Sequence, residues 1–489
     1  MAINWTEADI EKVVASVLKN LGAEPTACTE CAWSSTGYGA RRFVGVYEDM
    51  NDAIDAAESG YKAIRAMSLE EREKVIAIIR DLCRKEAPTM AALGVAETKM
   101  GRVDHKYAKH LLVADKTPGT EDIVEEFYSL VMQRPINPEI VNESDVRIIY
   151  TPLNGTGNIP VRRVLSDIGI KDVRIVKEQE SPDGNFPTCP YPNPEIRQVF
   201  ECGLKMAEEE SCDLLLATDP DCDRVGIAVN TGDSYKLMTG NEVGVLLAEY
   251  LLSRRKELGI LPENPVVVKS FVTTSLVDAV AKKYGAEVKS LLTGFKYIGE
   301  FITKLEAKGE EKRFIVGMEE SYGYLSGIHA RDKDAVVACA LICEMAAYYK
   351  SKGKSLYEVM EGIYKEHGMY LNALDNYAFK GSSGMAKMGE IMDNLRNNPP
   401  VEIAGMKVLS ISDFKKSEKI CRVTGEKTVI DLPSSNVLYY ALENSCGVIV
   451  RPSGTEPKIK IYYTACAKTR EDAQKIKDIM STEMKKFME

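Results

Sequence analysis

Three aspartates at every second position are the residues of this sequence best suited to chemistry. Asp219, Asp221 and Asp223 lie in "ATDPDCDRVGIAV" (217–229), directly after an apolar run. The carboxyl end of a strand in an α/β sheet is where ligand sites gather. Two carboxylates about 4 Å apart repel by roughly 4 kcal/mol at an effective dielectric of 20, so three converging ones need a cation. Hard oxygen ligands suit Mg²⁺. A solvated acidic turn is the alternative interpretation, which the flanking apolar runs and Arg224 disfavour.

A second stretch has the composition of a phosphate site. "VIVRPSGTEPKIKIYY" (448–463) places a guanidinium, two hydroxyls, a glycine and a lysine between two predicted strands: Arg451, Ser453, Gly454, Thr455 and Lys458. A phosphate dianion is bound by a bidentate cationic fork together with several neutral donors. A glycine also lets backbone N–H groups approach the anion. A hairpin turn that merely contains Pro and Gly is the alternative.

Two further stretches give weaker signals. In "GMEESYGYLSGIHARDKDA" (317–335), Glu319 and Ser321 could accept from and donate to vicinal sugar hydroxyls, and Lys333 supplies a cation. "LLTGFKYIG" (291–299) is a glycine-bearing turn with Lys296. Each of these stretches, taken alone, is compatible with an ordinary loop.

The elements that must position these residues follow from the hydrophobic pattern. From about Val146, short β-branched runs such as "VRIIYTP", "DLLLATD" and "PVVVKS" alternate with helical stretches, which predicts βα units with predominantly parallel sheets. From about residue 370, strands followed by a helix that begins at Arg470 predict a smaller α+β domain. We therefore expect α/β domains at 126–250 and 251–369 and an α+β domain at 370–489.

The first 125 residues have a different pattern. Apolar residues at helical spacing over 6–21 predict an amphipathic helix within segment 1–22. Residues 23–45 are rich in small and polar types and are interpreted as a linker. That first helix either docks on a partner or folds onto its own domain. Segment 46–125 is predicted to be mostly helical, with helices at 50–65, 69–84, 89–98 and 105–114.

Composition narrows the class of protein. The 489 residues carry 63 Lys+Arg against 73 Asp+Glu, a net charge of −10, with 45% hydrophobic residues. No apolar run reaches the roughly 20 residues of a bilayer span, and the acidic balance disfavours a nucleic-acid coat. Twelve scattered cysteines fit a reduced, cytoplasmic protein. We therefore expect small-molecule chemistry, with no nucleic-acid and no membrane partner.

The four stretches, in this order, resemble the α-D-phosphohexomutases, the family of phosphoglucomutase and phosphomannomutase. "YTPLNGTGNIPVRRVL" (150–165), "PDGNFPT" (182–188) and "TGNEVGVLL" (239–247) extend the resemblance over about residues 126–489. The family members are Mg²⁺-dependent isomerases that move a phosphate between C1 and C6 of a hexose through a bisphosphate intermediate. The resemblance thus implies an intramolecular phosphotransferase of carbohydrate metabolism, with a hexose phosphate as substrate and glucose 1-phosphate and glucose 6-phosphate as the expected pair.

The resemblance also implies a role for each candidate residue. Asp219, Asp221 and Asp223 would hold Mg²⁺, and Arg224, Lys296 and Lys333 would be catalytic or substrate-contacting cations. Glu319 and Ser321 would bind the sugar hydroxyls. The non-transferring phosphate would be bound by the five residues of the second stretch, Arg451, Ser453, Gly454, Thr455 and Lys458.

One family feature is missing from this sequence. The first domain of family members carries a serine, in a T-A-S-H-N-P type of loop, that becomes phosphorylated and donates its phosphate; here no serine is followed by His, Asn and Pro. Removing the phosphoryl donor should abolish turnover even where substrate still binds. An active mutase, a non-catalytic phosphosugar-binding protein and a chimera of two unrelated fragments all remain open.

In place of that domain, residues 67–123 resemble the N-terminal helices of CoA-acylating aldehyde dehydrogenases of bacterial microcompartments, "ETKMGR" (97–102) being the most specific piece. In that family a short amphipathic helix and a linker also come first and serve for encapsulation. The resemblance implies a shell protein as partner of residues 6–21, and the microcompartment interior as an alternative location.

Overall fold

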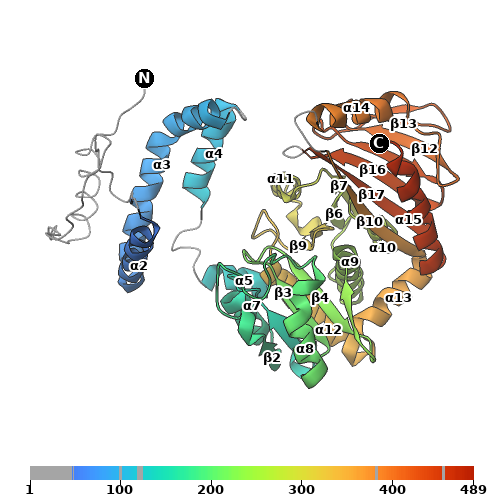
Figure 1. The fold of residues 1–489 in the computed structure, drawn as a ribbon. Coiled ribbons are helices and arrows are strands. Elements are labelled where there is room, and N and C mark those ends of the chain that lie inside the picture. Colours follow the sequence, from blue (N-terminus) through green and yellow to red (C-terminus); the bar gives the residue numbers. More distant parts are fainter. Residues whose placement is uncertain are drawn as a thin grey trace. The chain divides into compact units, whose positions relative to one another are not determined.

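The computed structural model describes residues 47, 49–98, 102–117, 125–379, 384–453 and 457–488. The chain divides into two compact units, Met1–Phe127 and Tyr128–Glu489 (Figure 1). The helix predicted at 6–21, the linker at 23–45, and Gly454 and Thr455 of the predicted phosphate site lie outside the described residues.

The described part of the first unit is made up of helices. They are α2 (Met50–Ala66), α3 (Leu69–Thr98) and α4 (Val103–Lys116), and α5 (Glu125–Met132) follows. The prediction of two helices at 69–84 and 89–98 was wrong, because α3 continues through Pro88. A proline inside a helix removes one backbone hydrogen bond. Ala87 and Ala91 are fully buried on either side of it, so packing of this face compensates for that loss.

Two mixed sheets form the core of the first two thirds of the second unit. One has the order β2-β1-β3-β4-β5 and the other β7-β6-β8-β9. Their strands are β1 (Arg147–Thr151), β2 (Asp172–Ile175), β3 (Leu214–Thr218), β4 (Val225–Asn230), β5 (Tyr235–Met238), β6 (Val266–Ser270), β7 (Glu287–Leu291), β8 (Phe314–Glu319) and β9 (Gly323–Leu325).

Parallel pairing, which the alternation of strands and helices predicted, holds only for part of each sheet. β1 pairs in parallel with β2 and β3, and β6 with β7 and β8. β3–β4, β4–β5 and β8–β9 are antiparallel. The connections at 219–224 and 320–322 are too short for the crossover that a parallel partner requires, so the chain turns back as a hairpin.

Helices cover both sheets and join them. They are α6 (Pro138–Glu143), α7 (Asn158–Asp167), α8 (Glu201–Glu210), α9 (Gly240–Glu257), α10 (Leu276–Lys283), α11 (Phe295–Glu306), α12 (Ala335–Ser351) and α13 (Leu356–His367). α12 is buried from Ala335 to Tyr348. It packs against α6 and α7 of the first α/β domain and against α9 and β9 of the second, so this one helix belongs to the core of both.

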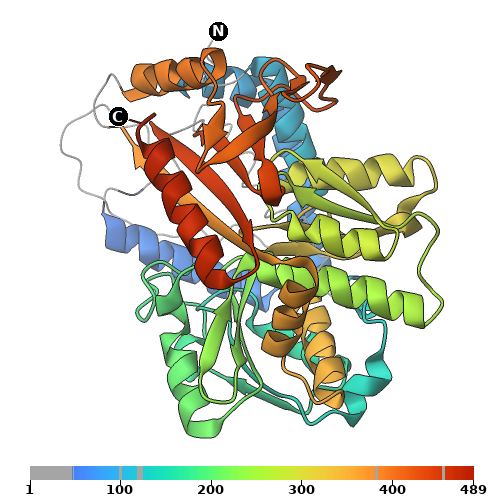
Figure 2. The same ribbon diagram turned by 90° about the vertical axis from the view of Figure 1, so that its right-hand side faces the viewer.

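The last part of the chain forms an antiparallel sheet with a terminal helix, as the pattern predicted, and with a second helix that the pattern did not predict. The strand order is β10-β17-β16-β15-β12-β13-β14, with β11 beside β12. α15, which begins at Arg470 as expected, lies across the sheet (Figure 2). Met480 and Met484 of α15 are buried with Tyr440 and Tyr463 of the sheet. The elements are β10 (Met369–Ala378), α14 (Gly384–Asn397), β11 (Glu402–Ile403), β12 (Met406–Asp413), β13 (Glu418–Cys421), β14 (Lys427–Val429), β15 (Leu438–Leu442), β16 (Gly447–Pro452), β17 (Lys458–Ala467) and α15 (Arg470–Lys485).

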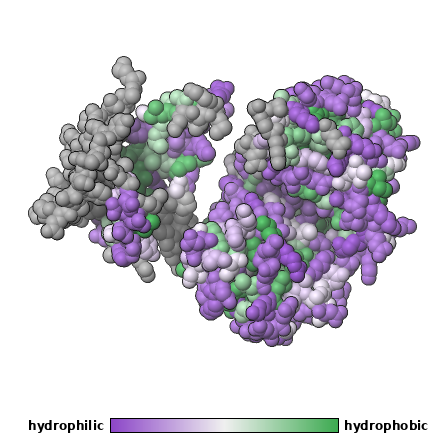
Figure 3. Space-filling view, viewed as in Figure 1, coloured by the Kyte–Doolittle hydropathy of each residue, from purple (hydrophilic) through white to green (hydrophobic). Residues whose placement is uncertain are grey.

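Hydrophilic residues dominate the visible face of the second unit (Figure 3). Within the ranges that the structure describes, no helix combines the length and the apolar composition that crossing a bilayer requires.

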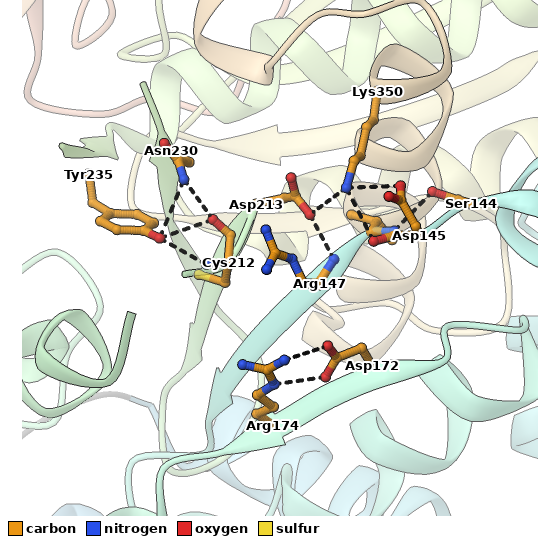
Figure 4. A network of polar contacts seen from close by, with 11 residues as sticks. Ser144, Asp145, Arg147, Asp172, Arg174, Cys212, Asp213, Asn230, Tyr235 and Lys350 are labelled. Carbon is orange, nitrogen blue, oxygen red and sulfur yellow. Dashed lines mark hydrogen bonds and ion pairs between the residues drawn. The ribbon is translucent and has the colours of Figure 1, made fainter. Parts of the chain in front are cut away.

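A polar network joins α12 to the first sheet at the end of the sheet where strands β1 and β3 begin (Figure 4). Lys350 Nζ lies 2.9 Å from Asp213 Oδ2 and 2.9 Å from Asp145 Oδ1. Asp213 Oδ2 also accepts from the backbone N–H of Arg147 at 2.8 Å. This network lies at the amino ends of the strands, whereas the aspartate-rich loop follows the carboxyl end of β3.

Candidate active site

The three aspartates converge in the hairpin loop between β3 and β4. One carboxylate oxygen from each of Asp219, Asp221 and Asp223 lies within 4.8 Å of the others. The loop is closed by a hydrogen bond from Cys222 N to Asp219 O at 3.0 Å. Cys222 adopts φ = +59°, a left-handed conformation that bends the chain so tightly that alternate side chains face one point.

The environment of Asp219 fits a cation. Its carboxylate is buried, and Oδ1 accepts from the backbone N–H groups of Asp223 at 3.0 Å and Arg224 at 2.9 Å. Burial, together with the negative charges of Asp223 and Asp221, raises the pKa of Asp219 to about 7. Asp223 Oδ1 is buried without a hydrogen-bond donor among the described residues. Mg²⁺ binds to carboxylate oxygens that lie close together and still lack hydrogen-bond donors.

Two of the predicted cations lie against this cluster. Arg224 Nε is 3.5 Å from Asp223 Oδ1 and 3.7 Å from Asp219 Oδ2. Lys333 Nζ lies 2.8 Å from Asp223 Oδ2, and its side chain is only 11% exposed. Lys333 can lie this deep because Gly323 has no side chain: a Cβ there would be 2.1 Å from Lys333 Cδ.

Glu319 and Ser321 lie beside the aspartate loop, at the end of β8 and in the β8–β9 turn. The two loops are linked by a hydrogen bond from Val225 N to Tyr322 O at 3.0 Å. Glu319 is buried and accepts from Gly294 N at 2.7 Å. Burial raises the pKa of Glu319, against the opposing effects of the Gly294 N–H and of Lys333.

Lys296 is placed differently from the other cations. It is exposed on α11, with Nζ 4.9 Å above the ring of Tyr297. Its neighbour Phe295 lies beneath Lys333, 5.6 Å from Nζ to the ring centre. Among the described residues, Lys296 therefore forms no ion pair with the three aspartates.

The described residues of the predicted phosphate stretch lie at the adjoining ends of the antiparallel strands β16 and β17. Arg451 lies near the end of β16 and Lys458 begins β17, and Ser453 N donates to Lys458 O at 2.8 Å. Tyr462 of β17 links these strand ends to the rest of the site. Burial and the negative charge of Glu320 raise the pKa of Tyr462 to about 12, against a hydrogen bond from Arg451. The same side chain packs in an apolar cluster with Val272, Leu292 and Phe414.

Sequence reasoning missed two acidic residues of the site. Glu195 Oε1 lies 3.2 Å from Arg224 NH1, and Asp332 Oδ1 lies 2.7 Å from Lys333 Nζ. Asp332 could have been suspected, because it precedes Lys333 in "ARDKDA". Glu195 is 29 positions from Arg224 and no local pattern marks it.

Part of this chain is similar to known proteins. Residues 125–232 match the model of "Phosphoglucomutase/phosphomannomutase, alpha/beta/alpha domain II", and residues 239–367 match that of domain III. The phosphoglucomutase of Staphylococcus aureus (strain MRSA252) is 35% identical over 338 residues, 69% of this chain and 60% of that protein. The phosphoglucomutase of Staphylococcus epidermidis (strain ATCC 12228) is 36% identical over 340 residues, 69% of this chain and 61% of that protein. The chain thus spans about 60% of the length of these relatives.

Solved structures give the same fold. Parafusin, a phosphoglucomutase from Paramecium, has a TM-score of 0.54 at 17% identity, covering 74% of this chain and 61% of its own. A phosphoglucomutase/phosphomannomutase family protein from Burkholderia thailandensis has a TM-score of 0.52 at 15% identity. The match covers 78% of this chain and 69% of that protein. Residues 125–232 and 239–367 of this chain thus match phosphohexomutase domains II and III, and they are preceded by helices and followed by an antiparallel sheet domain.

Proposed function

We propose that this protein binds a hexose phosphate and Mg²⁺ and acts as a phosphoglucomutase-like phosphohexomutase, interconverting glucose 1-phosphate and glucose 6-phosphate through a bisphosphate. The observation that carries the proposal is the meeting of Asp219, Asp221 and Asp223 with Arg224 and Lys333 in one loop cluster. The relatives named phosphoglucomutase, at about 35% identity, support the choice of sugar phosphate.

Each group has a proposed task. The three aspartates hold Mg²⁺, which when bound neutralises charge on a phosphoryl group. Lys333 and Arg224 add positive charge beside it, and Glu319 and Ser321 bind sugar hydroxyls. The phosphate that is not transferred is bound by Arg451, Ser453, Gly454, Thr455 and Lys458. Lys296 is exposed on α11, so it contacts the substrate only if the bound sugar extends to α11 or if α11 moves toward the sugar.

A second function is favoured by a specific observation, the missing serine loop. Without a phosphoryl donor, the same groups would make a phosphosugar-binding protein that does not turn over. Docking of residues 6–21 on a microcompartment shell protein belongs to this second proposal and rests on sequence resemblance alone.

One experiment separates the two functions. Binding of glucose 1-phosphate with Mg²⁺ is measured by calorimetry, and turnover by a coupled assay for glucose 6-phosphate with glucose 1,6-bisphosphate as primer. Binding with turnover supports the mutase, binding without turnover supports the binding protein, and no binding contradicts both.

Substitution ties either result to this site. Asp221→Ala should weaken Mg²⁺ binding by about tenfold or more and abolish any turnover. Asp233→Ala removes an exposed aspartate from the β4–β5 turn and serves as the matched control. Equal Mg²⁺ affinity in Asp221→Ala and wild type would contradict the metal assignment.

A further inference from the structure

A cleft of about 710 Å³ lies apart from the candidate active site. Its walls include Arg134 and Ile136 from the domain II segment, and Arg255, Lys312 and Gly327 from the domain III segment. None of the residues assigned to the metal, sugar or phosphate sites lines it.

Two arginines face this cleft without counter-ions. In the described parts of the chain, neither Arg134 nor Arg255 forms an ion pair, and Arg255 Nε is buried without a hydrogen-bond acceptor. Burial lowers the pKa of both guanidinium groups, and the positive charge of Arg134 lowers that of Arg255 further, against an opposing effect of Glu344. Two cations at one partly buried place repel each other, so an anion that joins them is stabilising.

The side chain of Arg134 is held in position rather than free in solvent. Arg134 Nε donates to Leu130 O at 3.0 Å. The side chain passes over Gly327, where a Cβ would lie 2.6 Å from Arg134 Cδ, and Gly327 has φ = +99°. The terminal amino groups of Arg134 therefore remain available in a fixed fork, which is the arrangement that binds an oxyanion with two hydrogen bonds.

The wall of the cleft that contains Ile136 is also held in position. Glu344 of α12, fully buried, accepts from the backbone N–H of Ile136 at 2.9 Å and also from that of Asn137. This anchors the segment after Arg134 to the helix shared by both domains. The cleft is thus preformed, and preformed sites lose little entropy on binding.

We propose that this cleft binds the phosphate group of a small metabolite at a site separate from the active site. Arg134 and Arg255 hold the phosphate oxygens, and Lys312 at the rim adds a third positive charge. Glu311 also lines the cleft and offers its carboxylate to a hydroxyl of the same ligand. Because the walls come from two domains, the bound anion joins domain II to domain III.

The proposal is tested on the full chain with inorganic phosphate, titrated by calorimetry in a chloride buffer. All variants are built on Arg451→Gln, which removes the other phosphate site that we propose. Arg451→Gln should still bind one phosphate, and adding Arg134→Gln or Arg255→Gln should weaken that binding by about tenfold or more.

Lys256→Gln, which changes the adjacent exposed cation of α9, is the matched control and should change the affinity by less than about twofold. Absence of phosphate binding to Arg451→Gln, or unchanged binding after either arginine substitution, would overturn the proposal.

A second measurement guards against variants that merely fail to fold. Without phosphate, Arg134→Gln and Arg255→Gln should unfold at the same temperature as the parent or higher, because each removes one of two repelling cations. With phosphate, the parent should gain thermal stability and these variants should not. A phosphate-dependent rise that persists in both variants would contradict a site in this cleft. Neither measurement depends on turnover or on Mg²⁺, so the result is independent of the proposed function.

Discussion

Buried carboxyl groups of the second unit are each stabilised by different donors. Glu319 accepts from Gly294 N, Glu320 from Ser270 Oγ at 2.9 Å, and Glu344 from Ile136 N. Burial raises the pKa of all three. Glu319 and Glu320 adjoin the candidate active site, whereas Glu344 lies on α12 and supports the wall of the arginine cleft. Glu344 therefore allows the effect of burial on one carboxyl to be measured without disturbing the active site.

The contribution of Glu344 to the stability of this protein should fall as pH rises from about 4.5 to about 7. Burial raises the pKa of Glu344 to about 7 from an ordinary value of 4.5. Between these pH values the folded state holds a proton that the unfolded state has released, so the free energy of unfolding declines as pH rises, by up to about 3 kcal/mol. Glu344→Gln keeps an oxygen acceptor for Ile136 N but cannot titrate, so its decline should be smaller.

Urea unfolding at several values between about pH 5 and pH 8 measures this difference. Glu390→Gln, an exposed position of α14, should behave as wild type. A pH dependence in Glu344→Gln identical to that of wild type would show that Glu344 is ionised in the folded protein throughout this range.

At the scale of elements, the start of α9 is fitted to the turn that carries the sugar-binding candidates. Thr239 and Glu242 form a reciprocal capping box, and Gly240 is the first helical residue. A Cβ on Gly240 would lie 2.1 Å from the backbone oxygen of Glu320. The helix can begin at this position only if the residue there has no side chain. The position of the turn that contains Glu320 and Ser321 therefore depends on Gly240 being a glycine.

Gly240→Ala should destabilise the protein by about 1–3 kcal/mol, because a backbone oxygen cannot move aside as a flexible side chain would. It should also weaken hexose-phosphate binding, since the β8–β9 turn must shift. Urea unfolding and calorimetry measure the two effects.

The matched control is Gly362→Ala in α13, where a Cβ meets nothing within 4 Å. That variant should be more stable by up to about 1 kcal/mol, because alanine favours the helix. Equal stability of Gly240→Ala and wild type would mean that α9 can begin elsewhere.

At the scale of the whole molecule, everything that forms the candidate active site lies in one unit. The two α/β sheets are joined by α12, and the C-terminal sheet packs on the second of them through Val272, Leu292, Phe414 and Tyr462. Phe271 and Phe414 stack with ring centres 5.2 Å apart across this contact. All of these contacts are made between residues of the second unit.

Deleting residues 1–124 should therefore leave cooperative unfolding and hexose-phosphate affinity unchanged. Circular dichroism during heating and calorimetry with glucose 1-phosphate and Mg²⁺ compare the deletion with the full chain. The deletion carrying Asp221→Ala serves as the negative control for binding. A shift in affinity of about tenfold or more would show that the N-terminal helices complete the site.

Local patterns predicted much of this protein. The strands, the helix from Arg470, and the convergence of Asp219, Asp221 and Asp223 with Arg224 follow from alternation and spacing within a few residues. Such patterns act through backbone geometry, which the nearest neighbours decide. Lys333 and Glu319 give only a weak local signal, which the family resemblance strengthens, and the structure places Lys333 against Asp223.

Tertiary packing decided the rest. It carries α3 through Pro88 and leaves Lys296 exposed. It also brings Glu195 to Arg224 and Glu344 to Ile136, which is 208 positions away. Contacts of this range arise when separate elements share one core, and their energies depend on burial and on which charges meet. The sequence by itself determined the chemical groups and their loops, and only the packed chain determined which of those groups lie together.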